Sequence, residues 1–309
     1  MIGDDPSKVP FFFRRLLAGL EGLGARTEIL ARKVDMLEEP DPAGHFDFVH
    51  NGRVPRLRAL NLGVAYLPGY FYVDPKGVNF ESTVADQVFV PSRVPVDRAA
   101  GFFADLRKTW VEGRRSRHPQ KDERQDFGTG HLAIFLQDWS DPVERAQWMD
   151  SETMVRTVVE GAGGRRVVVK PHPRYKGRET RAILKYLRGC GGDVKVTDAN
   201  VHDILQGAAA TVSISSSLAL EGMLHRVPAI LFGRTDLHHC ATTVTKPEDW
   251  PAALEAALGT DWPFDRYLLW FLRWHNVDAS RPFLPRVLDR MQAQGADLAA
   301  LGITPPEKG

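Results

Sequence analysis

The chain has few cysteines, almost no net charge and no long apolar run. Of its 309 residues only two are cysteines, Cys190 and Cys240, too few and too far apart in sequence for a disulfide framework or a zinc knuckle. Forty basic and thirty-nine acidic residues leave a formal net charge of +1, so no overall positive field exists to hold a nucleic-acid backbone. No stretch approaches the roughly 20 apolar residues that span a bilayer, and the N-terminus has no signal-peptide layout. We therefore expect a soluble cytoplasmic protein that does not bind nucleic acid.

Several catalytic motifs are also missing. The chain contains no Gly-x-x-x-x-Gly-Lys phosphate loop, no Gly-x-Ser-x-Gly elbow and no His-Glu-x-x-His. It has no convincing Asp-x-Asp, so a metal-bound diphosphate donor is not indicated. The run His238-His239-Cys240 is a poor metal site, because adjacent side chains point apart and no second ligand pair lies at a helpful spacing. We expect neither a metal nor a cofactor.

The length of the chain predicts two lobes around a cleft, because 309 residues exceed the usual single core of about 100 to 200 residues. We place an N-terminal α/β lobe at residues 1–125, a second lobe at 126–260 and C-terminal helices that pack back across the lobes at 261–309. The charged stretch 113–129, with the basic run 114–118, is typical of a solvated linker.

From Leu132 onward, apolar runs of strand length alternate with amphipathic stretches of helix length. This alternation predicts βαβ units and a doubly wound, Rossmann-like parallel sheet. The expected strands are 132–136, 166–169, 194–196, 211–214 and 229–232. The expected helices are 142–160, 177–188, 201–206, 217–224 and 247–258.

The N-terminal part has weaker signals. Residues 46–50 and 64–67 are expected to form strands with a basic helix between them. Residues 10–23 have helical apolar spacing beside Arg14 and Arg15, so this helix either packs on its own domain or touches a membrane surface. The aromatic residues at 267–274 repeat at helical spacing, which is typical of a core helix.

Three polar sequences follow expected strands, at the edge where open parallel sheets bind ligands. The first is Lys170-Pro171-His172-Pro173. Each proline restricts its own backbone and that of the preceding residue, so the loop fixes how His172 projects. His172 could donate to a phosphate oxygen and Lys170 could add charge. A proline-bounded turn with an exposed histidine is the alternative.

The second sequence, Ser213 to Gly222, lies where a strand meets a helix. The hydroxyls of Ser215, Ser216 and Ser217 and the free N–H groups of a helix N-terminus predict an anion site. Glu221 lies one helical turn in, where a carboxylate can reach the hydroxyls of a ribose. Serines that only cap the helix are the competing interpretation.

The third sequence is Gln137-Asp138-Trp139-Ser140-Asp141-Pro142. Asp141 or Ser140 would make a natural helix cap, with Pro142 in the first turn. Alternatively Asp138 or Asp141 points into the cleft as a catalytic carboxylate.

Taken in order, these sequences resemble the bacterial capsule polysaccharide biosynthesis and export family, which includes retaining β-Kdo transferases that use CMP-Kdo. The resemblance covers about 80 to 235 and rests on Gln137-x-x-x-Asp141, Lys170 to Pro173, Ser215 to Gly222 and Val227-Pro228-Ala229. A fainter similarity lies in Asp74 to Ser82, which includes Asn79.

The resemblance implies a metal-independent, GT-B-like glycosyltransferase whose C-terminal lobe holds the donor nucleotide. His172 and the three serines would hold the CMP phosphate, and Glu221 would hold the ribose. Asp141 would act at the anomeric carbon, with Gln137 beside it. Asn79 and Ser82 would lie on the acceptor side. The implied partners are a nucleotide-sugar and a glycan or glycolipid acceptor, with peripheral contact to the inner membrane or a capsule assembly complex.

Two other functions fit the same residues. One is a phosphotransferase that uses a CDP-alcohol to build teichoic-acid-like polymers. The other is an inactive nucleotide-binding subunit of a capsule complex, suggested by Pro68 to Tyr72, where the family commonly carries two charged residues that this chain lacks. A Rossmann-like protein of unrelated function is the remaining alternative.

Overall fold

The computed structural model describes residues 10–30, 44–137, 146–173, 177–191 and 193–306. The chain divides into two compact units. Unit 1 combines Met1–Asp86 with Leu272–Gly309, and unit 2 is the continuous segment Gln87–Phe271.

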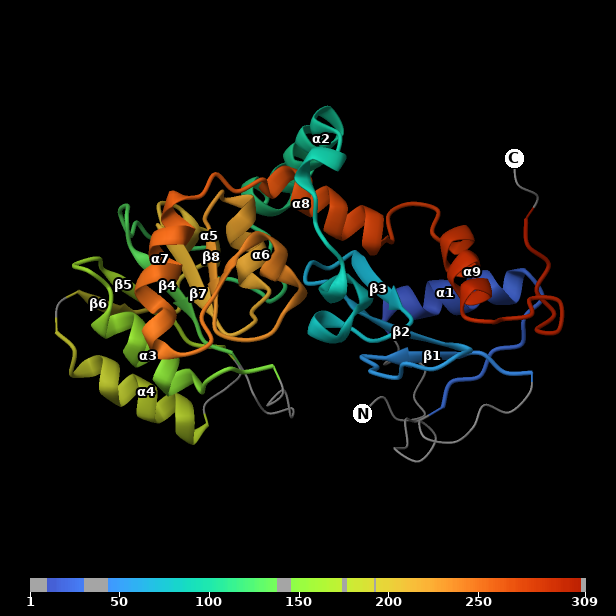
Figure 1. Ribbon diagram of the computed structural model, residues 1–309, viewed down its shortest axis with the longest axis horizontal. Coiled ribbons are helices and arrows are strands. Elements are labelled where there is room, and N and C mark those ends of the chain that lie inside the picture. Colours follow the sequence, from blue (N-terminus) through green and yellow to red (C-terminus); the bar gives the residue numbers. More distant parts are fainter. Residues whose placement is uncertain (1–9, 31–43, 138–145, 174–176, 192, 307–309) are drawn as a thin grey trace. The chain divides into compact units, whose positions relative to one another are not determined.

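Unit 2 is built on a six-stranded parallel sheet (Figure 1). Its strands are β4 (Leu132–Phe135), β5 (Val167–Lys170), β6 (Val194–Val196), β7 (Ala210–Ser213), β8 (Ala229–Leu231) and β9 (Thr242–Thr243). They lie in the order β6-β5-β4-β7-β8-β9, and every neighbouring pair is parallel. The chain therefore builds outward from β4 to one edge and then returns to β7 to build toward the other, which is the doubly wound arrangement.

Helices cover both faces of this sheet because its strands are apolar on both sides. They are α3 (Ser151–Glu160), α4 (Arg178–Arg188), α5 (Val201–Leu205), α6 (Leu218–Leu224) and α7 (Trp250–Gly259). Val167 and Val169 pack in one core with α3, α4 and α7, whereas Val168 packs with α5 in a second core. All three valines are buried, so β5 has the continuous apolar run of a central strand.

The five strands predicted for this unit are confirmed to within a residue, and four of the five helices to within three residues. The exception is the helix expected from residue 142. Helix α3 begins only at Ser151, with Asp150 as its N-cap accepting from the N–H of Thr153 at 2.6 Å. Gln147 instead forms an antiparallel bridge with Gly233, which a helix at that point would prevent. Strand β9, only two residues long, was not predicted.

The remaining helices of unit 2 are α2 (Val96–Arg107), which continues as a π-helical turn to Glu112, and α8 (Phe264–Leu269). The predicted aromatic core is confirmed at Tyr267 and Phe271, both fully buried. Phe89 packs on Tyr267 with ring centroids 5.4 Å apart, which brings residues before α2 into the same core.

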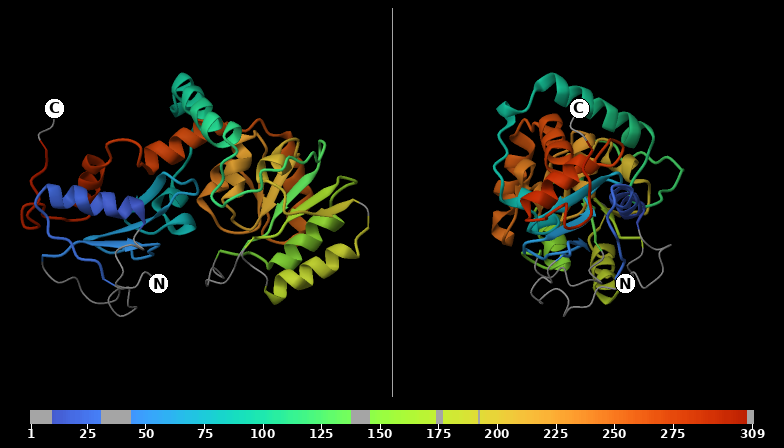
Figure 2. Two further views of the ribbon diagram at one scale, coloured as in Figure 1. Left: turned by 180° about the vertical axis from the view of Figure 1, so that it is seen from behind. Right: turned by 90° about the vertical axis from the view of Figure 1, so that its right-hand side faces the viewer.

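Unit 1 has a four-stranded mixed sheet covered by two helices (Figure 2). Its strands, in the order β1-β2-β3-β10, are β1 (Asp47–His50), β2 (Ala59–Val64), β3 (Tyr70–Asp74) and β10 (Val277–Asp278). Only β1 and β2 are parallel. Helices α1 (Phe11–Gly22) and α9 (Leu284–Ala293) pack their apolar faces on Leu60, Leu62 and Val73.

Two arginines of α9 fix the segment that leads into β10. Arg286 donates to the carbonyls of Arg273 and Asn276, and Arg290 donates to those of Val73 and His275, at 2.5 to 2.8 Å. The carbonyls of Arg273 and His275 lie at the end of a helical segment and have no partner within it, so the guanidinium groups satisfy them, and Arg290 also ties the segment to β3 through Val73. Burial lowers the pKa of Arg290 to about 10.

The structure corrects two predictions in unit 1. Val64 ends β2 and residues 65–67 form the turn after it, where the second strand was expected; the interval 51–63, where a basic helix was expected, is an irregular loop to residue 58 followed by β2 itself. Positive φ angles at Asn51 (47°) and Arg58 (52°) exclude a continuous helix there. The helix expected at 10–23 is confirmed as α1.

The unit boundaries also differ from the predicted lobes. Residues 87–125 belong with the parallel sheet and not with the N-terminal lobe, and the C-terminal segment 261–309 is shared between the units. Helix α2 packs against α6 and α8, which explains why this part of the chain joins unit 2.

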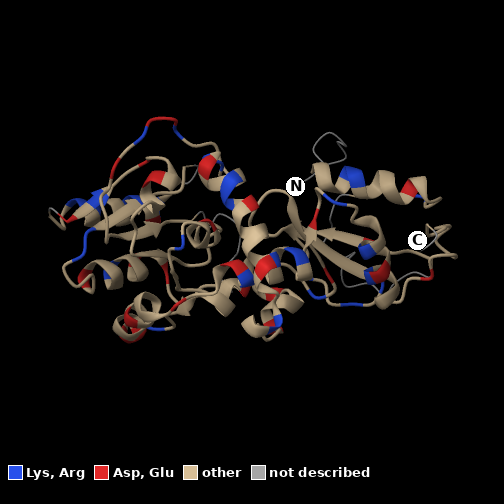
Figure 3. Cartoon of the chain, turned by 90° about the horizontal axis from the view of Figure 1, so that it is seen from above, with Lys and Arg blue, Asp and Glu red and all other residues tan. Residues whose placement is uncertain are grey.

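Basic and acidic residues are interspersed along the chain in both units (Figure 3). Within the described ranges, no helix is long and apolar enough to cross a membrane.

Candidate functional site

The carboxyl ends of β4 and β7 meet at the point where the order of the sheet reverses. Gln137 follows β4, and its Oε1 accepts a hydrogen bond from the N–H of Ser215 at 2.7 Å. Its Nε2 lies 3.5 Å from the hydroxyl oxygen of Ser215, which follows β7. In doubly wound sheets this reversal point is where ligands bind. The structure thus brings two predicted site residues together at the expected place.

The serine loop is held mainly by its own side chains. The N–H of Ser216 donates to the hydroxyl of Ser213, and the hydroxyl of Ser216 accepts from the N–H of Leu218, both at 3.2 Å. Ser217 precedes α6 but makes no side-chain capping bond. Because α6 has only seven residues, its dipole alone is a weak reason to expect an anion here. The side chains of Ser213 and Ser216 therefore determine the shape of the loop, whereas Ser217 does not cap the helix.

Glu221 lies in the first turn of α6 and is completely buried. Its Oε1 accepts from the hydroxyl of Ser116 at 2.9 Å, while Oε2 has no partner among the described residues. Burial raises the pKa of Glu221 to about 8, and the nearby Ser116 and the N–H of Arg117 oppose the shift. The predicted ribose-binding carboxylate is therefore covered by residues 116–117 in this structure.

The Lys170 to Pro173 loop follows β5. The ammonium group of Lys170 donates to the carbonyls of Asp198 (3.0 Å) and Ala199 (2.6 Å), and burial lowers its pKa. Lys170 thus holds the loop that leads into α5. The His172 ring contacts the ring of His118 edge-on, with centroids 5.5 Å apart, and Pro173 is exposed.

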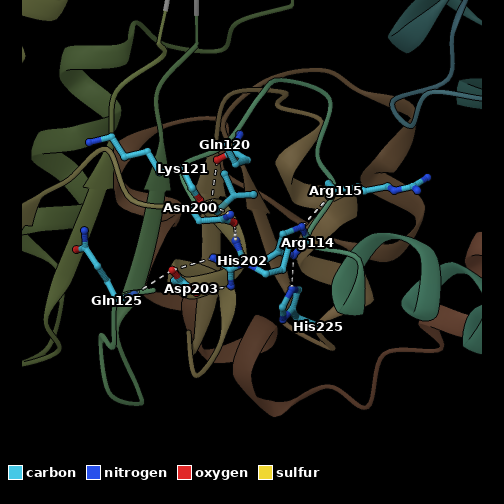
Figure 4. A network of polar contacts seen from close by, with 10 residues as sticks. Arg114, Arg115, Gln120, Lys121, Gln125, Asn200, His202, Asp203 and His225 are labelled. Carbon is cyan, nitrogen blue, oxygen red and sulfur yellow. Dashed lines mark hydrogen bonds and ion pairs between the residues drawn. The ribbon is translucent and has the colours of Figure 1, made fainter. Parts of the chain in front are cut away.

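His118 belongs to a segment that we call the strap, residues 114–125, which has no regular secondary structure. The strap is bound along α5 (Figure 4). Arg114 forms a two-pronged ion pair with Asp203 at 2.7 and 3.2 Å, and the N–H of Gln125 donates to the same carboxylate at 3.0 Å. Burial raises the pKa of Asp203, but Arg114 and Gln125 outweigh it and bring the pKa below its ordinary value.

The middle of the strap caps the start of α5. The side chain of Gln120 accepts from the N–H of Val201 at 3.1 Å, and Asn200 donates to the carbonyl of Lys121 at 2.9 Å. An exposed ion pair between Lys121 and Asp198 adds to this contact. The ends and the middle of the strap are therefore fixed to the same helix.

Two histidines complete the contact. His202 Nε2 lies 2.7 Å from the carbonyl of Arg115, and His202 Nδ1 lies 2.9 Å from Nε2 of His225. A carbonyl oxygen only accepts, so Nε2 of His202 carries the proton and Nδ1 accepts from His225. Burial lowers the pKa of both rings, that of His225 to about 4.

These contacts correct part of the expectation that residues 113–129 form a solvated linker. Arg115, Arg117, Lys121 and Arg124 are exposed, as expected, but the stretch is fixed to α5, and the Arg114 side chain is only 23% exposed and its partner Asp203 only 5%. Ser116, Arg117 and His118 are thus residues near the predicted site that the sequence did not reveal. The sequence of a basic run does not indicate which carboxylate, far along the chain, one of its residues will bind.

Other predicted site residues are placed elsewhere or lie outside the described ranges. Asp138 and Asp141 fall in the segment 138–145, which the structure does not describe. Asn79 and Ser82 lie in unit 1 after β3, where Ser82 is fully buried and its N–H donates to the carbonyl of Asn79 at 2.9 Å. Asn79 adopts a positive φ of 55° at the start of a short 3-10 helix.

The chain is similar to several solved structures at low identity. The β-Kdo 2,7 transferase of Thermosulfurimonas dismutans KpsC is 15% identical, with a TM-score of 0.48 over 76% of this chain and 78% of that one. The β-Kdo 2,4 transferase of the same KpsC is 18% identical, with a TM-score of 0.41 over 63% and 72%. A UDP-GlcNAc 2-epimerase of Methanocaldococcus jannaschii is 14% identical, with a TM-score of 0.35 over 62% and 52%.

No protein-family model and no curated protein matches the chain. The TM-scores of all three structures are below 0.5. The α/β fold therefore rests on the strand order and the helix placement of this chain, and not on these similarities.

Proposed function

We propose that this protein is a glycosyltransferase of surface or capsular polysaccharide synthesis that takes a sugar from a CMP-activated donor. Kdo is the first donor to test, because the spacing of the site motifs resembles the β-Kdo transferase family. The two free cysteines fit a reducing compartment, so we propose that it acts in the cytoplasm.

In this proposal the donor nucleotide binds at the carboxyl edge of the sheet in unit 2. His172 and the loop of Ser215, Ser216 and Ser217 hold the phosphate, with Gln137 orienting that loop. Glu221 accepts from the hydroxyls of the ribose. Lys170 acts indirectly, because its ammonium group is occupied by the carbonyls before α5.

For the chemical step we propose Asp141 as the carboxylate at the anomeric carbon, with Asp138 as the other candidate. If the configuration is retained, a glycosyl ester on that carboxylate would form as CMP leaves and would then pass the sugar to the acceptor hydroxyl. The acceptor, a glycan or glycolipid, would meet Asn79, whereas the buried Ser82 would act by shaping the loop that carries Asn79.

The observation that carries the proposal is the meeting of Gln137 and Ser215 at the reversal point of the sheet. Polar side chains from two non-consecutive strands converge there, as a nucleotide site in this kind of sheet requires. The buried Glu221, with one oxygen unpartnered among the described residues, supports the same location.

Calorimetric titration with CMP, UMP and GMP tests the donor site. We expect micromolar binding of CMP, roughly 8 kcal/mol, and weakening by tenfold or more in His172→Ala and Glu221→Ala. Arg156→Ala is the matched control, because Arg156 forms an exposed ion pair with Glu152 on α3. Equal affinity for the three nucleotides, or unchanged binding by both site variants, would contradict the assignment.

Transfer from CMP-Kdo then tests the reaction. We expect CMP release that depends on an acceptor and is lost in Asp141→Ala. Nucleotide binding without CMP release, unchanged by Asp141→Ala, would favour the inactive capsule-complex subunit.

A CDP-alcohol phosphotransferase is the second candidate, favoured by the contact between the rings of His118 and His172. Two imidazoles at one phosphate could donate and accept protons during phosphoryl transfer. Both enzymes release CMP, but only this one leaves a new phosphodiester, so mass spectrometry of the product separates them.

Peripheral contact with the inner membrane or a capsule complex also remains a proposal. Phe11 at the start of α1 is 65% exposed, and Arg14 lies one turn further along the helix. Cosedimentation with anionic vesicles, compared between the wild type and Phe11→Ser, tests the membrane contact.

A further inference from the structure

The carboxylate of Glu221 has an internal partner from far along the chain. The Ser116 hydroxyl donates to Oε1 at 2.9 Å, across 105 residues of sequence. The backbone N–H of Arg117 also stabilises the carboxylate. Oε2 has no partner among the described residues, although the side chain is completely buried. A buried polar oxygen without a partner is costly, so this arrangement leaves the Glu221 carboxyl group, whose pKa burial raises to about 8, incompletely satisfied.

The strap is anchored on both sides of this contact. Arg114 and Arg115 are held by α5 on one side, and Gln120 and Lys121 are held by it on the other. Between them, Ser116 and Arg117 reach α6 through Glu221. These residues can therefore leave the carboxylate while the anchors on α5 stay in place.

We infer that Ser116 is a specificity-determining residue of the nucleotide site: its hydroxyl occupies, in the ligand-free protein, the position that a ribose hydroxyl takes on Glu221. The inference rests on the proposed function, because it takes Glu221 as the ribose-binding group. A ribonucleotide replaces one O–H donor by another and can also reach the unpartnered oxygen with its second hydroxyl.

A 2′-deoxyribonucleotide can make fewer hydrogen bonds with Glu221. Lacking the 2′-hydroxyl, it either leaves Ser116 in place and loses contact with Glu221, or displaces Ser116 and leaves the carboxylate with fewer donors. A site built to bond a hydroxyl discriminates strongly against a ligand that lacks it, because the buried group is then unpaired. The internal contact thereby selects ribonucleotides.

Displacing Ser116 also alters the neighbouring histidines. His118 lies two residues further along the strap, and its ring contacts that of His172. Movement of residues 116–118 away from α6 would separate the two imidazole rings and make His172 accessible to the phosphate. One displacement would then prepare both the ribose and the phosphate positions.

Titration of the full chain with CMP and with 2′-deoxy-CMP tests the inference. We expect the wild type to prefer CMP by at least about tenfold. Ser116→Ala removes the internal competitor and should bind CMP about fivefold more tightly, the effect of one hydrogen bond. Ser116→Thr keeps the hydroxyl and should match the wild type. Lys121→Ala, which removes only an exposed ion pair of the same strap, is the control.

Amide hydrogen exchange gives a second readout. We expect CMP to speed exchange in the peptide that contains Arg117, because its N–H loses the Glu221 carboxylate, whereas ligands usually slow exchange near their sites. Melting temperatures of the variants confirm that each is folded.

The outcomes separate the two proposals. No CMP binding by the wild type would remove the proposed nucleotide site and this inference with it. CMP binding that Ser116→Ala weakens or leaves within twofold, or slower exchange at Arg117, would refute the role of Ser116 alone.

Discussion

Replacing Glu221 by glutamine should change how the stability of unit 2 depends on pH. The pKa of the buried carboxyl is raised from 4.5 to about 8 by burial. Between these values the folded protein holds a proton that the unfolded chain releases. The contribution of Glu221 to the free energy of unfolding is therefore fully present below pH 4.5 and is lost as the pH rises to about 8.

The size of the effect follows from the shift. Each pKa unit corresponds to about 1.4 kcal/mol, so the full shift is worth about 5 kcal/mol, of which about 3 kcal/mol is lost between pH 5.5 and 8. Glutamine has nearly the same shape and does not titrate. The free energy of unfolding of Glu221→Gln should thus fall about 3 kcal/mol less than that of the wild type over this range.

Urea unfolding followed by tryptophan fluorescence measures this difference. All tryptophans except Trp274 lie within unit 2, so the signal reports chiefly on that unit. Other titrating groups are common to both proteins and cancel in the comparison. Parallel profiles for wild type and variant from pH 5.5 to 8 would show that Glu221 is already ionised in the folded protein, and would refute the reasoning.

Three further changes test neighbouring features of unit 2. Gly222→Ala should lower the free energy of unfolding by about 1 to 3 kcal/mol, because an added Cβ would lie 2.7 Å from Cγ2 of Thr211; unchanged urea stability would contradict this close packing. Arg114→Ala leaves the buried Asp203 without its cation, so it should lower the free energy of unfolding by about 3 kcal/mol in the same assay. It should also speed amide exchange in the strap; unchanged exchange would mean that the position of the strap does not depend on this ion pair. The lowered pKa of His225, about 4, predicts a loss of up to about 3 kcal/mol as the pH falls from 6.5 to 4, since the unfolded chain takes up the proton first; His225→Gln should show a shallower loss.

The sheet of unit 2 could be predicted because its strands carry their own signal. A run such as Val167 to Val169 is apolar at every position, as a strand buried on both faces must be. The meeting of Gln137 and Ser215 followed from this sheet, since residues just after parallel strands share one edge. These parts depend on local pattern and on general rules of topology.

The parts that could not be predicted depend on distant contacts. Helix α3 starts at Ser151 because Gln147 pairs with Gly233, far along the chain. Strand β9 has only two residues, too few for any periodic pattern. Glu221 is bonded to Ser116, far along the chain, and no local property of either residue indicates the other.

The division of the chain affects the order in which it can fold during synthesis. Unit 2 is one continuous segment, so all its strands have left the ribosome before the last part of unit 1 is made. Unit 1 must wait for β10 and α9, because β10 pairs with β3 and α9 covers Leu60 and Val73. A chain truncated after residue 271 and released from the ribosome would therefore present a folded parallel sheet together with an N-terminal segment whose apolar strands are uncovered, the form most exposed to chaperones and proteases.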